Sequence, residues 1–248
     1  MPSSSGASTS NNNGGVGVSF ESFLEGWLVR QEHYLDELLT AQQNHHESHE
    51  RDLKDLISRV LSHYQQYYEE KSRAAHCNVF IVFSPTWFTP FERTFLWIGG
   101  FKPGMAFSLV ETAVDDLTQD QRRRVARLRQ ETRAEEKALT DQLARIQESV
   151  AAPPVVELVR REGQGQGRRE GEEGDTDAVV EALRAAMEGV LGSADTLRTR
   201  TAERVVEILN PVQNVKFLAA AAQLQLKIRM WGLQRERGPA PAASGFTT

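Results

Sequence analysis

An aromatic segment constrains the fold more than any other feature of the sequence: residues 84–110 read SPTWFTPFERTFLWIGGFKPGMAFSLV. Aromatic residues make up 8% of the chain, yet they crowd into this stretch. Thr89 suits an N-cap, Pro90 suits the first helical position, and Glu92 stands where it closes a capping box. The pattern predicts a short helix that begins after Thr89 and ends at Gly99 and Gly100, because glycine pairs stop helices.

A helix over this segment would be apolar nearly all round. Phe91, Phe95 and Ile98 would share one face, and Leu96 and Trp97 would widen the apolar surface. Such a helix must be enclosed by others, so we expect it to form a core plug. Alternatively, its rings line a pocket for an apolar ligand, for which a fatty-acid-like molecule is the natural guess. The candidate core or pocket residues are Trp87, Phe91, Phe95, Trp97 and Phe101.

Most of the remaining chain shows helical periodicity. Apolar residues recur at helical spacing over residues 19–43, 49–75, 118–150, 177–209 and 212–231. Thr118 with Gln121, and Asn210 with Gln213, repeat the helix-start signal. The segment NVFIVF at residues 78–83 is expected to form a buried helical turn, since no partner strand is in evidence. The sequence therefore predicts an all-α bundle of about five to seven helices around the short aromatic helix.

Composition sets the domain boundaries. Residues 1–19 are rich in Ser, Asn and Gly and are expected to be a disordered tail. Residues 162–174, EGQGQGRREGEEG, are expected to be a mobile linker, and residues 233–248 a frayed tail. The helical domain then covers residues 20–232.

Charge and cysteine content narrow the function classes. A net charge of −5 gives no electrostatic case for nucleic-acid binding. The single cysteine, Cys77, excludes an intramolecular disulfide, fits a reducing compartment and is expected to be a buried structural thiol. The sequence has no apolar run long enough for a bilayer and no secretory signal. We therefore expect a protein of the nucleus and/or cytoplasm that does not enter membranes.

No motif indicates an enzyme. The sequence lacks GxSxG, HExxH and a phosphate-binding glycine loop. His45 and His49 have the spacing of a helical metal pair, with His46 nearby, but a solvated polar face is favoured because no third ligand is evident. We expect no catalytic residue, metal or cofactor.

A run of arginines opens the helix predicted after Thr118. It could contact phosphates or an acidic partner. Alternatively, it belongs to an exposed helix whose charges pair at i, i+4 with Glu131, Glu135, Glu136 and Asp141, which is favoured. The candidate basic contact face consists of Arg122, Arg123 and Arg127, with Arg124, Arg129 and Arg133 close by.

Three segments resemble one known family. They are FESFLEGWLVRQEHYLDELL at residues 20–39, FSPTWFTPFERTFLWIGGFKPGMAFSLV at 83–110, and ILNPVQNVKFLAAAAQLQLKIRMWG at 208–232. They resemble the plant seed-dormancy control domain of the Delay-of-Germination type, which also forms the C-terminal region of TGA basic-leucine-zipper transcription factors. The resemblance covers about residues 20–232.

This resemblance implies a non-catalytic plant regulator in seed dormancy, maturation and abscisic-acid signalling. It also implies regulatory proteins as partners, among them clade A protein phosphatases 2C. Whether the protein forms a homo-oligomer is left open by the sequence. TGA members bind DNA through a basic region and zipper, but residues 1–19 hold no Lys, Arg or heptad. DNA binding, direct or through a zipper-bearing partner, is therefore kept as an alternative. Haem binding in the family rests on C-terminal histidines, and here no histidine follows His76.

Overall fold

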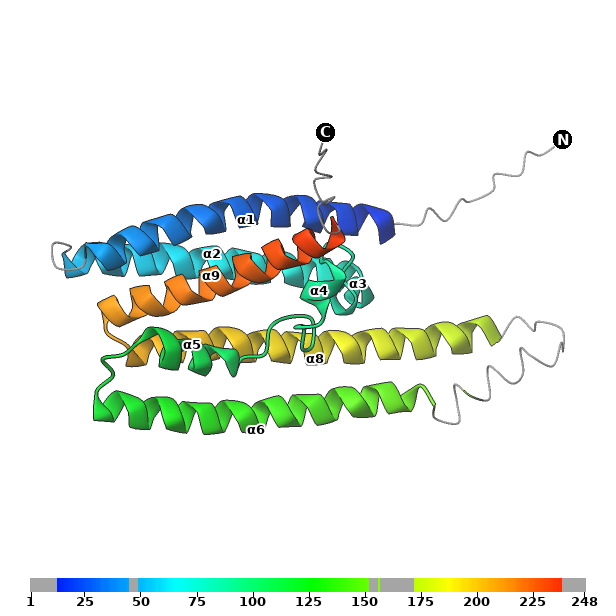
Figure 1. Ribbon diagram of the computed structural model, residues 1–248. Coiled ribbons are helices and arrows are strands. Elements are labelled where there is room, and N and C mark those ends of the chain that lie inside the picture. Colours follow the sequence, from blue (N-terminus) through cyan, green and yellow to red (C-terminus); the bar gives the residue numbers. More distant parts are fainter. Residues whose placement is uncertain (1–12, 45–48, 152–155, 157–171, 238–248) are drawn as a thin grey trace, which may run out of the picture.

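The computed structural model describes residues 13–44, 49–151, 156 and 172–237, and within them the fold is all-α, as predicted. The long helices lie side by side along the molecule (Figure 1). Helix α1 packs against α2 and α9, and α6 packs against α8. The helices are α1 (Asn13–Gln43), α2 (Glu50–Cys77), α3 (Val79–Phe83), α4 (Pro90–Arg93), α5 (Met105–Ala113), α6 (Gln119–Ser149), α8 (Glu172–Ile208) and α9 (Pro211–Glu236).

The predicted helix starts are confirmed. Thr89, Thr118 and Asn210 each accept a hydrogen bond from the backbone three residues later, and each forms a complete capping box. The helical turn predicted for residues 78–83 is present as α3, and Asn78 caps it by accepting from the Phe80 amide. These starts depend on contacts within one turn, which a sequence pattern records directly.

The predicted extent of the aromatic helix is wrong. Helix α4 ends at Arg93, well before Gly99 and Gly100, and the chain then forms hydrogen-bonded turns. Ile98 and Gly99 have φ angles of 47° and 64°, so the glycine serves a tight turn and does not stop a helix. Phe91, Phe95 and Ile98 therefore do not form one helical face.

Some predicted boundaries differ from the helix ends, and others lie outside the described residues. Helix α1 begins at Asn13, inside the predicted tail of residues 1–19, because adding a turn to an existing helix costs far less than starting one. Helix α9 continues to Glu236. Residues 1–12, most of the predicted linker and residues 238–248 lie outside the described part.

The interior contains two hydrophobic clusters. The first cluster lies where α2, α5, α6 and α9 meet, and the second joins the start of α1 to α3, the aromatic segment and the middle of α8. Helices α1, α2, α6 and α8 each contribute buried side chains to both clusters. Tyr64 on α2 packs against both. The long helices therefore connect the two clusters into one body.

None of the helices in the described part of the chain has the length and apolar character to cross a membrane.

Candidate functional site

The site is built around a tight turn between α4 and α5. The Trp97 amide donates to the Gly100 carbonyl at 2.6 Å, and the Gly100 amide donates back at 3.2 Å. Positive φ at both central residues, Ile98 and Gly99, is typical of a type I′ turn. A Cβ at Gly99 would lie 2.8 Å from Leu191 Cδ1, so α8 fits closely against the turn. The turn therefore lies directly against α8.

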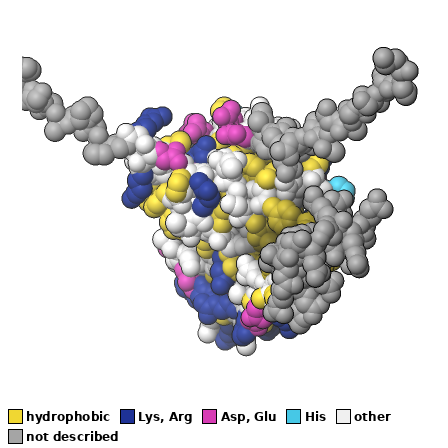
Figure 2. All heavy atoms as spheres, turned by 90° about the vertical axis from the view of Figure 1, so that its right-hand side faces the viewer, with side chains coloured by type: hydrophobic (Ala, Val, Ile, Leu, Met, Phe, Trp, Pro, Cys, Tyr) yellow, Lys and Arg dark blue, Asp and Glu magenta, His cyan; other side chains and the backbone are white. Residues whose placement is uncertain are grey.

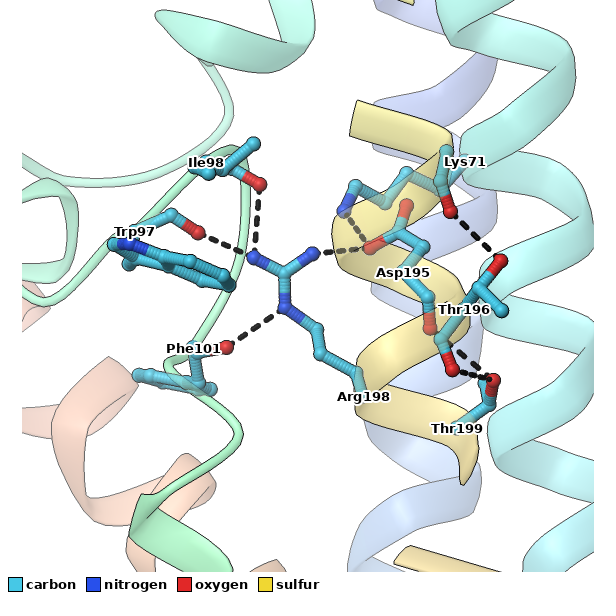
Figure 3. Close-up of polar contacts among 9 residues, drawn as sticks. Lys71, Trp97, Ile98, Phe101, Asp195, Thr196, Arg198 and Thr199 are labelled. Atoms are coloured by element: carbon cyan, nitrogen blue, oxygen red, sulfur yellow. Dashed lines mark hydrogen bonds and ion pairs between the residues drawn. The ribbon is translucent and has the colours of Figure 1, made fainter. Parts of the chain in front are cut away.

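One side chain of α8 binds carbonyl groups in and beside this turn. Arg198 Nε donates to the Phe101 carbonyl at 2.7 Å, and Nη2 donates to the carbonyls of Ile98, at 2.8 Å, and Trp97 (Figure 3). Its guanidinium carbon lies 5.3 Å from the centre of the Trp97 ring. Nη1 donates to Asp195 Oδ1 one turn earlier on α8. Because Arg198 is 6% exposed, these contacts replace water around its charge.

A second buried cation completes the cluster. Lys71 on α2 is 2% exposed, and its Nζ donates to Asp195 Oδ1 at 2.7 Å. Burial lowers the pKa of Lys71 to about 8, against the opposing effect of Asp195 and with Arg198 lowering it further. With one carboxylate between two cations, the cluster carries a surplus positive charge inside the protein at neutral pH.

A cavity of about 480 Å³ opens beside this cluster. Helices α2, α5, α8 and α9 and the chain just after the tight turn form its walls, and its lining is mainly apolar. Arg198 and Phe101 lie at its wall. The apolar lining residues include Ile57, Leu61, Met105, Ala106, Leu109, Phe217, Leu218, Ala221 and Leu224.

A smaller cavity of about 90 Å³ lies on the other side of the same side chains. Tyr64, Tyr68, Phe101, Arg198 and Gln225 line both cavities and thus form the partition between them. The partition is polar: Gln31 on α1 donates to the Tyr64 hydroxyl at 2.5 Å and to Gln225 Oε1 at 3.2 Å. Burial raises the pKa of Tyr64 to about 12, so its hydroxyl stays neutral at neutral pH.

The five aromatic candidates do not line one pocket. Phe101 borders both cavities. Trp87 is buried in the second cluster, 4.8 Å from the Phe20 ring centre. Half-buried Trp97 donates from Nε1 to Thr140 on α6 at 3.0 Å.

Phe91 and Phe95 lie away from the core. Their rings meet edge to face at 5.1 Å, and the Arg235 guanidinium lies 4.3 Å from the centre of the Phe91 ring. Phe95 is 39% exposed, so the prediction that it belongs to the core is wrong. The early end of α4 explains the difference, since the chain leaves the helix before Phe95 can turn inward.

The arginine run of α6 lies on the surface. We call Arg122, Arg123, Arg124 and Arg127 the arginine face; all four are exposed, and none takes part in an ion pair within the described part of the chain. Figure 1 shows α6 along the lower side of the molecule, and Figure 2, which views the end of the molecule away from the start of α6, shows Lys and Arg side chains beside Asp and Glu on that lower side.

The glutamates expected to neutralise this run have other partners. Glu131 pairs with Arg204 at 2.7 Å, and Glu135 pairs with Arg200, both on α8. Glu136 is buried and accepts from the Gly104 amide at 2.6 Å. The expected i, i+4 pairing along α6 is present between Lys137 and Asp141, but these three glutamates bond to other elements, so none of them forms an ion pair with the arginine face.

The remaining candidates carry no chemistry that the structure describes. His45 and His46 lie outside the described residues, and His49 is exposed at the start of α2. No group of three or more potential metal ligands occurs among the residues that are described. Cys77 is exposed at the end of α2, so the prediction of a buried thiol is wrong. Cys77 follows the buried Ala75 by two residues, which places it on the opposite side of α2.

Sequence reasoning missed the buried ionic cluster. A signal was present, because Lys71 follows Tyr64 by seven residues and Tyr67 by four, which places a charge on the apolar face of α2. Arg198 likewise follows Leu191 by seven residues. A charge at a core position indicates a buried partner, but the pattern alone does not identify it.

Comparison with known proteins shows to which family the chain belongs. The profile of the family described as DOG1, seed dormancy control, matches residues 34–112. Over 217 residues the chain is 40% identical to Protein RESPONSE TO ABA AND SALT 1 of Arabidopsis thaliana, covering 85% of this chain and 94% of that protein. The chain belongs to the seed dormancy control family. Protein ZW2 of the same plant is 38% identical over 218 residues, covering 87% of this chain and 96% of ZW2.

The family also links the chain to transcription factors. Transcription factor TGA7 of Arabidopsis thaliana is 33% identical over 212 residues, which cover 86% of this chain but 55% of TGA7. The resemblance inferred from the aromatic segment and the α9 sequence is therefore confirmed. The named relatives of this family member thus include a protein named for its response to ABA and salt and a transcription factor.

Proposed function

We propose that this protein is a non-enzymatic regulator of seed dormancy and maturation that acts in abscisic-acid signalling, in the nucleus and/or cytoplasm, through contacts with other proteins. The observation that carries the proposal is the 40% identity to RESPONSE TO ABA AND SALT 1 along 94% of that protein. The match covers 85% of this chain and is therefore not confined to one motif, which favours a shared role for the whole domain.

The interior charges support a regulatory role over a catalytic one. A catalytic side chain needs polar atoms that are not engaged by the protein and that face a substrate. Arg198 instead donates to three backbone carbonyls and to Asp195, and Asp195 accepts from Lys71 as well. The charges thus join the 97–101 segment to α8 and α2.

Seeds of the source plant that lack the protein test the proposal. We expect freshly harvested mutant seeds to germinate more completely than wild type and to be less inhibited by added abscisic acid. Reintroducing the intact gene is the control and should restore the wild-type dose response. Superimposable dose-response curves for mutant and wild type would refute the proposed function.

Clade A protein phosphatases 2C are the proposed partners. Titration calorimetry with purified proteins should show saturable binding to a clade A phosphatase and none to a phosphatase 2C of another clade. Equal heats of binding with both phosphatases would contradict a specific contact with clade A phosphatases. The dormancy role would then need a different partner protein.

A second candidate function is transcriptional regulation. The match to TGA7 favours it, although the matched region covers 55% of that factor. A gel-shift series over increasing salt, with and without a zipper-bearing TGA protein, tests it. A sequence-dependent shift by the protein alone would support direct contact, whereas a supershift that needs the TGA protein would support binding through a partner. No shift in either case would exclude this candidate.

A third candidate function is sensing of an apolar ligand. The cavity of about 480 Å³ has the size and apolar lining of small-molecule sites, which measure roughly 300–1,000 Å³. Native mass spectrometry should then show a co-purified apolar molecule. Ala221→Trp would fill the cavity and abolish that species, whereas Ala126→Trp, on the exposed side of α6, should keep it. A bare protein mass from wild type would exclude this candidate.

A further inference from the structure

We propose that the arginine face of α6 docks an acidic segment of a partner protein. This inference rests on the proposed function as a protein-binding regulator, for which it supplies a surface and a partner chemistry. The face lies opposite the stripe that attaches α6 to the bundle. Val125 and Leu128 are buried, Arg123 and Arg127 lie on the opposite side of the helix, and Arg122 and Arg124 flank them, one on each side.

Exposed arginines without an ion pair also stand singly elsewhere in the described part of the chain, as at Arg51 and Arg145, but here four occur within six residues. On the same α6–α8 pair, Arg200, Arg204 and Lys137 each have a carboxylate partner. Glu131, which stands four residues after Arg127, bonds to Arg204. Asp120 lies in the first turn of α6 but forms no ion pair with the face within the described residues. Four arginines therefore lie close together without an ion pair, although acidic residues are near them in the sequence.

This arrangement opposes helix stability. Arg123 and Arg127 stand at i, i+4, where like charges repel each other. Bound carboxylates would remove this repulsion. Guanidinium groups also suit carboxylates because they form paired, parallel hydrogen bonds with them.

An acidic peptide fits the face better than a nucleic acid does. Residues 122–127 rise by about 8 Å along the helix, which accommodates two or three carboxylates. Specific DNA binding commonly uses about 6–10 phosphate contacts, more than this face supplies. The whole chain carries 29 Lys and Arg against 34 Asp and Glu, so an extended polyanion would meet repulsion beyond the face.

Fluorescence anisotropy with a short labelled peptide of alternating Glu and Ser tests the proposal. The double variant Arg123→Glu with Arg127→Glu should weaken binding by about tenfold or more at low salt, since two exposed ion pairs become repulsive. The matched control is Arg51→Glu with Arg145→Glu, which makes the same charge change at two exposed, unpaired positions elsewhere. It should bind the peptide within about twofold of wild type.

Three outcomes would overturn the proposal: no saturable peptide binding by wild type at low salt, equal weakening by both double variants, or tighter binding of a duplex DNA that the α6 variant alone abolishes. Circular dichroism melts establish that both variants are folded. The measurement uses purified protein and a synthetic peptide, so it does not depend on the germination assay. Failure of the dormancy role and failure of this docking surface therefore remain separate results.

Discussion

Arg198 shows how much of this fold depends on a single side chain. It bonds to three carbonyls about a hundred residues earlier in the chain and to Asp195 on its own helix. Arg198→Met should destabilise the protein by about 3–5 kcal/mol, because it removes one partner from a buried ionic network and takes the Arg198 donor from the Ile98 and Phe101 carbonyls. Urea denaturation followed by circular dichroism measures this loss.

The control for this prediction lies two residues away. Arg200 is exposed and pairs with Glu135 on the surface, so Arg200→Met should cost less than about 1 kcal/mol. Equal midpoints for the two variants would mean that the Arg198 cluster contributes no more than a surface pair.

His63 should make stability depend on mildly acidic pH. Its ring stacks on Trp27 at 4.3 Å, and burial, with a smaller contribution from Arg30, lowers its pKa from 6.5 to about 4. Between these values the unfolded chain binds a proton that the folded chain rejects, so the His63 contribution to stability is lost as pH falls from about 6.5 to 4. His63→Phe keeps the stacked ring without the titration. As the pH falls from about 6.5 to 4, the free energy of unfolding of His63→Phe should therefore increase relative to that of wild type.

Urea denaturation at several pH values measures this effect as a difference between proteins, which cancels most of the carboxylate titration. His49→Phe is the control, since that side chain is exposed and its environment changes little on folding. A difference between His63→Phe and wild type that stays constant from pH 7 to pH 4.5 would contradict the prediction.

At the scale of elements, one substitution should have opposite effects in two helices. Gly232 on α9 lies against the α4 cap, and a Cβ there would be 2.1 Å from Thr89 Oγ1. Gly192 on α8 has open space around it. Gly192→Ala should stabilise by about 0.5–1 kcal/mol through helix propensity, whereas Gly232→Ala should destabilise because it displaces α4 from α9. Thermal melts compare them; stabilisation by both would show that α4 is not fixed at this contact.

The same contrast explains which elements the sequence predicts. The starts of α4, α6 and α9 were predictable, because Thr89, Thr118 and Asn210 act within one turn of their own helix. The end of α4 was not, since the turn that replaces the helix is held by Arg198, which no local pattern connects to it. Contacts within one helical turn can thus be predicted from a sequence pattern, whereas contacts between distant residues cannot.

The candidate site follows the same rule at a larger scale. The arginine face was visible as a run of charges, and its exposure follows from helical spacing. Its lack of partners was not visible, because the acids at i, i+4 were expected to pair along α6 and instead reach α8. The cavity was also not predicted at its true place, since Phe101 is the one aromatic candidate that lines it.

For the whole molecule, the two clusters should unfold together. Trp27 and Trp87 report on the second cluster by fluorescence, while circular dichroism reports on all helices. Val205, fully buried, belongs to the first cluster. Val205→Ala should cost about 2 kcal/mol and shift both transitions equally, because four long helices run through both clusters. Val190→Ala, in the second cluster, should do the same. If Val205→Ala moves the circular dichroism transition but leaves the tryptophan transition in place, the halves are separate folding units.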